Sequence, residues 1–105
     1  MTSSTVERWD ELPLEKVTEM VSRKVMPGGK QTLSQVHLKR GAHIPLHAHD
    51  SEQLLYVLQG ELACAVSGRE LTVVEGDVLR VPGGIFHQAI ALDDTFILVV
   101  RASVA

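Results

Sequence analysis

The chain has 105 residues, which allows one domain and excludes a dinucleotide-binding dehydrogenase or a TIM barrel. Hydrophobic residues make up 45% and charged residues 22%, as in ordinary folded domains, so a disordered chain is excluded. A net charge of −3 argues against a nucleic-acid partner, and the single cysteine, Cys64, excludes a disulfide framework and a thiolate zinc site. With no signal peptide and no apolar run that could span a membrane, we expect a cytoplasmic protein without a membrane partner.

The first stretch with a regular pattern, residues 14–26, is ambiguous. Val17, Met20, Val21 and Val25 fit one face of an α-helix, yet Val17, Val21 and Val25 also share one face of a β-strand. The stretch is rich in valine and leads directly into a Pro-Gly-Gly turn. We therefore favour an extended conformation, with the helix as the alternative.

The rest of the chain predicts an all-β domain. Turn residues recur at short intervals, and the runs between them are rich in valine, leucine and isoleucine, a pattern typical of an antiparallel sandwich or barrel. Glycine reaches positive φ without strain, so Gln59-Gly60 and Ser67-Gly68 each predict a β-hairpin. We expect an N-terminal arm over residues 1–12 and one barrel over residues 13–105. The predicted strands are residues 31–38, 53–58, 61–67, 70–74, 78–81, 87–92 and 95–103.

Histidine is the residue type that stands out, with five histidines against one cysteine. His47 and His49 are two positions apart, so in a strand both imidazoles point to the same face, and Gln53 shares their parity. His87 from a neighbouring strand would complete a compact set of neutral donors, which suits a divalent transition metal. His43 lies at a strand entry and receives no role.

The histidine pair belongs to a longer spaced pattern. Gly41 is followed by five residues, then His47 and His49, three further residues, Gln53, six residues and Gly60. A glutamate in place of Gln53 would complete a known motif of the form Gly, five residues, His-x-His, three or four residues, Glu, six residues, Gly.

A second spaced pattern follows. Gly76 is followed by five residues, then Pro82, Gly84 and, after two residues, His87, with Ala91 where the corresponding motif has asparagine. Four of the five marked positions match in each motif. In these motifs the sequence resembles the cupins, and we identify it as similar to a small single-domain cupin of the cupin 2 conserved-barrel family. The resemblance implies a cupin fold: a double-stranded β-helix, or jelly-roll barrel.

Carried over by position, the resemblance implies His47, His49, Gln53 and His87 as ligands of one divalent metal ion, with Zn, Mn, Fe or Ni as candidates. Gln53 stands where the family has glutamate, so all four donors are neutral and the ion would keep its double positive charge. Glu52 is the rival for the fourth position. Strand alternation points Glu52 away from the histidine pair, which favours Gln53.

The resemblance implies a metal-dependent enzyme of the isomerase, lyase or dioxygenase class, acting on a small polar or anionic metabolite. The sequence is similar to small cupins that convert unsaturated uronates into linear ketones, but residues 95–103 lack the acid expected in the last strand. Arg101 in that strand could bind a substrate carboxylate or form an exposed salt bridge, and His37 is a second candidate to line the pocket. The alternative function is a non-catalytic ligand-binding or sensing module. The family also implies a homodimer.

Overall fold

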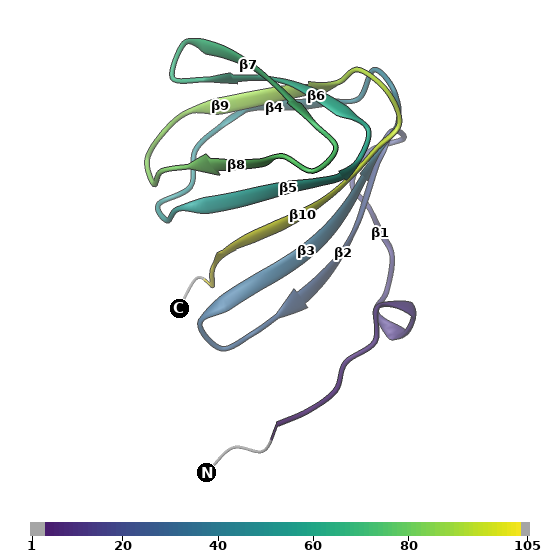
Figure 1. Ribbon diagram of the computed structural model, residues 1–105. Coiled ribbons are helices and arrows are strands. Elements are labelled where there is room, and N and C mark those ends of the chain that lie inside the picture. Colours follow the sequence, from purple (N-terminus) through teal and green to yellow (C-terminus); the bar gives the residue numbers. More distant parts are fainter. Residues whose placement is uncertain (1–3, 104–105) are drawn as a thin grey trace.

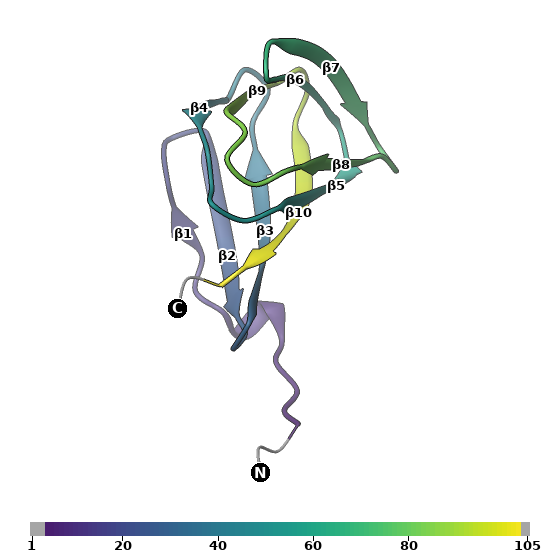
Figure 2. The same cartoon turned by 90° about the vertical axis from the view of Figure 1, so that its left-hand side faces the viewer.

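The computed structural model describes residues 4–103 and consists of two antiparallel β-sheets that face each other (Figures 1 and 2). The larger sheet has the strand order β1-β2-β3-β10-β5-β8, and the smaller sheet has the order β4-β9-β6-β7. One short 3-10 helix, η1 (Trp9–Glu11), precedes the strands. The strands are β1 (Glu15–Lys16), β2 (Val21–Pro27), β3 (Gln31–Leu38), β4 (His43–His47), β5 (Gln53–Gln59), β6 (Glu61–Val66), β7 (Arg69–Val74), β8 (Val78–Val81), β9 (His87–Ala91) and β10 (Thr95–Ala102).

The strands follow the alternation of the sequence. β3 and β8 have the predicted bounds, and the five other predicted strands end within one residue of their predicted limits. Along β5, Gln53, Leu55 and Val57 are buried, whereas Leu54 and Tyr56 are exposed on the outer side of the larger sheet. The all-β prediction is therefore confirmed.

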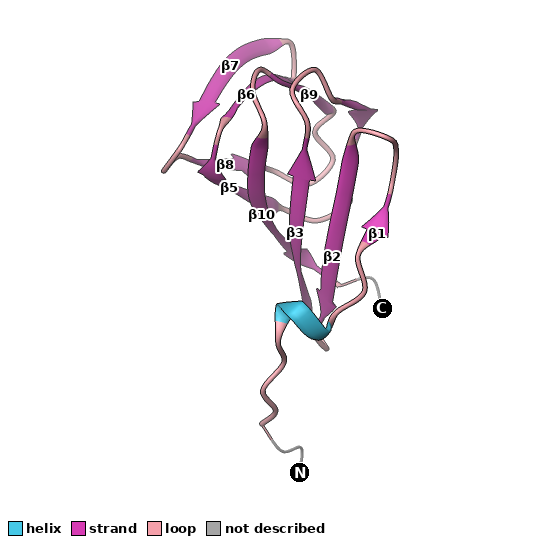
Figure 3. Cartoon of the chain, turned by 90° about the vertical axis from the view of Figure 1, so that its right-hand side faces the viewer, coloured by secondary structure: helices cyan, strands magenta, loops and turns pink. Residues whose placement is uncertain are grey.

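Residues 14–26 are extended, as the sequence favoured, and contain no α-helix. β1 lies beside β2 at the edge of the larger sheet (Figure 3). The carbonyl oxygen of Val21 closes the turn between them by accepting hydrogen bonds from the backbone N–H groups of Val17 at 2.9 Å and Thr18 at 3.1 Å. The residues that fit a helical face are thus divided between a turn and a strand.

The chain crosses from one sheet to the other at Gly60, and the hairpin predicted there is wrong. β5 pairs with β10 and β8, whereas β6 pairs with β7 and β9. Gly60 does have a positive φ of 98°, but a Cβ at this position would lie 2.5 Å from the carbonyl oxygen of Asp94. The hairpin predicted at Ser67-Gly68 is confirmed, and both residues have positive φ, as a type I′ turn requires.

The hydrophobic core fills the space between the sheets. Leu62 from the smaller sheet and Val57 from the larger sheet are fully buried, and Ile97 is nearly so. The half-buried side chains of Val36 and Val99 extend the core along the inner face of the larger sheet. Apolar inner faces on both sheets are the arrangement that a β-sandwich needs.

The N-terminal segment runs away from the sheets, with η1 below the ends of β2 and β3 (Figure 3). A hydrogen bond of 2.7 Å from the Lys24 ammonium to the carbonyl oxygen of Trp9 joins η1 to β2. Residues 1–3 of the predicted arm and residues 104–105 of the predicted domain lie outside the described residues. The division between arm and domain stays a prediction. No helical segment within residues 4–103 is long and apolar enough to cross a membrane.

The crossing at Gly60 gives a stability test with a matched control. Alanine at Gly60 or Gly68 meets the same cost of a positive φ, about 1–2 kcal/mol. Only at Gly60 does the added Cβ also overlap backbone, whereas nothing lies within 4 Å of it at Gly68. We expect Gly60→Ala to lower the free energy of unfolding in urea by about 2 kcal/mol more than Gly68→Ala. Equal losses of unfolding free energy in the two variants would show that the close approach of Gly60 to Asp94 does not require glycine.

Candidate metal centre

Three histidines meet at the end of the barrel where the chain passes from β4 to β5 and from β8 to β9, the end that faces the viewer in Figure 2. His47 ends β4 and pairs in register with His87, which begins β9. His49 lies in the loop after β4. One ring nitrogen from each of the three lies within 4.8 Å of the others.

The path that brings His49 to this cluster differs from the predicted one. The parity argument needs one regular strand through His47 and His49, but β4 ends at His47 and its register against β9 shifts between Ile44 and His47. Gln53 is likewise not in that strand, because it begins β5. Loop geometry therefore sets the position of His49, and the alternation of β5 sets the side to which Gln53 points.

The Pro82-Gly83-Gly84 turn holds the His49 loop in place. The backbone N–H of Gly84 donates a hydrogen bond of 2.7 Å to the carbonyl oxygen of His49. A Cβ at Gly83 would overlap the carbonyl oxygen of Asp50, so only glycine lets the two loops approach this closely. The two motifs therefore support each other through their backbones.

Hydrogen bonds also fix the tautomers of two rings. His47 Nδ1 lies 2.8 Å from the carbonyl oxygen of Pro45, and His87 Nδ1 lies 3.0 Å from that of Ile85. A carbonyl oxygen only accepts, so each Nδ1 carries the hydrogen and each Nε2 keeps its lone pair. His87 Nε2 is buried and has no hydrogen-bond partner among the described residues. Metal-binding histidines are commonly oriented in this way by a carbonyl group behind the ring.

Gln53 and Glu52 lie on opposite sides of the larger sheet. Gln53 is only 6% exposed and lines the same cavity as the three histidines. The Glu52 side chain is 54% exposed, and its carboxylate lies 3.8 Å from the guanidinium of Arg80. The structure thus brings Gln53, and not Glu52, to the cluster.

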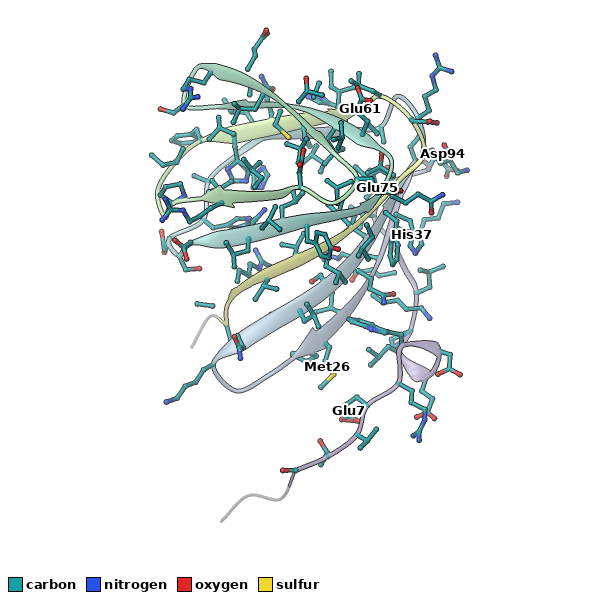
Figure 4. The ribbon with its side chains drawn as sticks, in the orientation of Figure 1. Glu7, Met26, His37, Glu61, Glu75 and Asp94 are labelled. Atoms are coloured by element: carbon teal, nitrogen blue, oxygen red, sulfur yellow. The ribbon has the colours of Figure 1, made fainter. Side chains whose placement is uncertain are left out.

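The cluster opens into a cavity of about 410 Å³ between the sheets, within the size range of small-molecule sites. His43 also lines this cavity, although the sequence reasoning gave it no role. Alternation along β4 does not identify it, because Ile44, of the opposite parity, lines the cavity as well and the register shifts before His47. His37 does not line the cavity. It is exposed, stacks on Phe96 at a centroid distance of 4.2 Å, and points away from the sandwich at the end near Asp94 (Figure 4).

Arg101 and His49 are in contact inside the cavity. Arg101 Nη1 lies 3.0 Å from His49 Nδ1 and 3.3 Å from His49 Nε2. Burial lowers the pKa of His49, and its neighbours Arg101, His47 and His87 lower it further, in that order. His49 is therefore held in the neutral form that can donate a lone pair.

Cys64 also lines the cavity. It is buried, and burial raises the pKa of its thiol. A buried thiol with a raised pKa is a poor nucleophile and a poor metal ligand, so Cys64 belongs to the wall of the cavity rather than to its chemistry.

Known proteins resemble this chain in its fold. The structure of an RmlC-like cupin from Shewanella frigidimarina superposes with a TM-score of 0.88 at 20% identity, covering 97% of this chain and 93% of that chain. KdgF from a Halomonas species gives a TM-score of 0.88 at 23% identity, covering 98% and 96%. The polyketide cyclase RemF from Streptomyces resistomycificus gives 0.81 at 18% identity, covering 95% and 80%. Comparison with curated proteins gives no significant match.

The sequence itself matches the family model described as cupin domain over residues 34–101. That range contains all three clustered histidines, Gln53 and Arg101. It also covers well over half of the chain, and its strands form the same sandwich as the cupins of known structure. The chain belongs to the cupin family.

Proposed function

We propose that His47, His49, Gln53 and His87 hold one divalent transition metal ion, and that the protein is a metal-dependent enzyme. The observation that carries the proposal is the buried Nε2 of His87, which has a lone pair, no hydrogen-bond partner within residues 4–103, and two further imidazoles beside it. A buried polar atom without a partner costs about 1–3 kcal/mol, and a metal ion would remove that cost.

The donor set indicates the kind of chemistry. Three imidazoles and one amide are all neutral, so they suit Zn, Mn, Fe or Ni and leave the charge of the ion uncompensated. When bound, such an ion supplies a Lewis acid that polarises a carbonyl or enol oxygen. Isomerases, lyases and ring-opening enzymes share this chemistry, and a dioxygenase is the variant that three neutral histidines would support with iron. We assign the reaction to the isomerase, lyase or dioxygenase class. The polyketide cyclase RemF, a cupin of similar fold, supports the assignment to an enzyme.

A non-catalytic ligand-binding module is the second candidate, and one observation favours it. Among the described residues that line the cavity there is no aspartate or glutamate to act as general base. The two functions differ in the fate of the ligand. Incubation of small keto acids with metal-loaded protein, followed by NMR, should show conversion that is absent from the His47→Ala/His49→Ala variant. Binding without conversion would support the module instead.

We also propose a homodimer formed through the outer face of the larger sheet. Tyr56 and Val78 are cross-strand neighbours on this face and are 40% and 59% exposed. Leu98 is the other cross-strand neighbour of Tyr56 and continues the apolar surface onto β10. An exposed apolar surface is typical of a protein–protein interface. In a dimer with twofold symmetry the same surface of each subunit meets its copy, so both sides of the interface are apolar.

A cytoplasmic location is part of the same proposal. It is supported by Cys64, which is the only cysteine of the sequence and is buried as a free thiol.

The metal site can be tested by metal content. We expect purified protein to bind one equivalent of a divalent metal, measured by elemental analysis after dialysis. His87→Ala should weaken binding by at least about a hundredfold, because loss of a ligand costs more than the tenfold to hundredfold of an outer-shell change. His37→Ala, which changes an exposed histidine outside the cavity, is the matched control. Equal metal binding by the two variants would contradict the site.

The fourth ligand can be tested by charge. Gln53→Glu places a carboxylate among the histidines, so we expect metal affinity to rise by about tenfold or more, measured by competition with a chelator. Glu52→Gln should leave the affinity unchanged, because Glu52 faces Arg80 on the outer side. A Gln53→Glu variant that folds and binds metal with unchanged affinity would remove Gln53 from the ligand set.

The homodimer can be tested by mass. Light scattering should give twice the chain mass for the native protein and the chain mass for Tyr56→Glu, because a buried unpaired carboxylate opposes association. Leu92→Glu changes a residue of similar exposure, 44%, that follows β9 and lies outside the proposed face, so it should remain dimeric. A monomeric native protein at working concentration would exclude the proposed interface.

A further inference from the structure

Arg101 carries a positive charge on the inner side of the sandwich. It pairs with Gln53 of β5 and Thr32 of β3, and it shares the parity of Ile97 and Val99, which also line the cavity. Its side chain is half-buried. A guanidinium in this position needs polar partners, because an unpaired cation is costly to take out of water.

The other arginines near the site have carboxylate partners. Arg23, which lines the same cavity, makes two hydrogen bonds of 3.0 Å to Glu15, and Arg80 lies 3.8 Å from Glu52. For Arg101, no aspartate or glutamate among residues 4–103 lies within 4.0 Å. Arg101 is therefore a cavity cation that lacks a counter-ion from the described part of the chain.

The only polar partner that the structure gives Arg101 within residues 4–103 is His49. A neutral imidazole has a single acceptor nitrogen. If His49 uses this lone pair as a ligand, as proposed above, it can no longer accept a hydrogen bond from Arg101. The guanidinium then presents its donors to the cavity, where a carboxylate is the group whose geometry matches it bidentately.

The walls of the cavity specify the rest of the ligand. Few polar side chains line it besides the histidines, the arginines and Gln53: Thr18, Ser34 and Gln88. A sugar acid carries a hydroxyl on nearly every carbon. Most of these hydroxyls would find no hydrogen-bond partner in the cavity. The remaining lining residues are apolar: Val17, Val21, Ile44, Pro45, Leu55, Cys64, Val66, Leu79, Val81, Val36, Ala89, Ile97 and Val99.

We propose that the natural ligand is a small carboxylate with an apolar body, bound through two hydrogen bonds from Arg101 to its carboxylate. Its carboxylate lies beside the histidine cluster, because Arg101 contacts His49, and its hydrocarbon part lies along the valine and isoleucine walls. The proposal deepens the proposed function by narrowing the substrate from a polar or anionic metabolite to an apolar acid. It rests on that function for the use of the same cavity. The Arg101 anchor itself needs no metal, because His49 contacts only Nη1 and the guanidinium has further N–H donors for a carboxylate.

Calorimetric titration with four probes tests this ligand class. The probes are hexanoate and benzoate, the sugar acid glucuronate, and benzamide, a neutral analogue of benzoate. Each is titrated into chelator-treated protein and into zinc-loaded protein, and metal content is measured on the same samples. The variants are Arg101→Gln, Arg101→Lys, and Arg69→Gln as a control at an exposed arginine of β7.

We expect hexanoate or benzoate to bind at least tenfold more tightly than glucuronate and benzamide. Arg101→Gln should weaken this binding by about tenfold to a hundredfold in the chelator-treated protein, the value of a charge-assisted bidentate pair. The affinity of Arg101→Lys for the acid should lie between those of Arg101→Gln and the native protein. Lysine keeps the positive charge but does not offer the planar pair of N–H donors that binds a carboxylate bidentately. Arg69→Gln should bind like the native protein.

Three results would overturn the proposal: equal binding by Arg101→Gln and native protein, glucuronate binding as tightly as the apolar acids, or no binding by either apolar acid. The failure of the metal site gives a different pattern. In that case zinc does not bind, yet the dependence of acid binding on Arg101 persists in the chelator-treated protein. Zinc affinity that is equal or higher in Arg101→Gln shows that the variant keeps the histidine cluster intact, since removal of a neighbouring cation favours a divalent ion.

Discussion

The close approach of two loops is the constraint on which the candidate site depends. The chain after β4 carries His49, and the chain after β8 carries the two glycines that precede His87. Their backbones touch, with the Gly84 N–H on the His49 carbonyl and Gly83 against the Asp50 carbonyl. A side chain between them would separate ring nitrogens that now lie within 4.8 Å of one another. Glycine is therefore needed here for its size, and main-chain packing positions the histidines of the candidate metal centre.

The sequence predicts most of the strands and the identity of the clustered histidines, because both depend on local patterns. Alternation alone places Gln53 inside and Glu52 outside, and the structure agrees. The path of the chain from His47 to Gln53 was not predictable in the same way. A register shift within β4 and a loop at His49 replace the regular strand that parity assumes. Such irregularities are set by long-range pairing with β9, which no local pattern encodes.

Gly60 is a second position at which local sequence patterns do not determine the path of the chain. A glycine with positive φ serves a tight hairpin at Gly68 and a crossing between sheets at Gly60, so the residue type alone does not distinguish them. The difference lies in strand pairing. β5 pairs with β10 and β8, and β6 pairs with β9 and β7, so β5 and β6 do not pair with each other. His37, a candidate to line the pocket, lies outside the cavity. It pairs with Phe96 of β10 and stacks on it, on the face of β3 opposite to the half-buried Val36.

Three features of the cavity shift its charge in one direction. Gln53 is an amide at the position where the motif has a carboxylate, β10 contributes no acid, and Arg101 places a cation beside His49. Each feature by itself would weaken a metal site, since less negative charge opposes a divalent ion. Together they leave positive charge for a ligand to neutralise, within walls that are largely apolar and strengthen electrostatic interactions. An anionic ligand is thus the component that balances this cavity, and we expect metal and acid to bind more tightly together than either does alone.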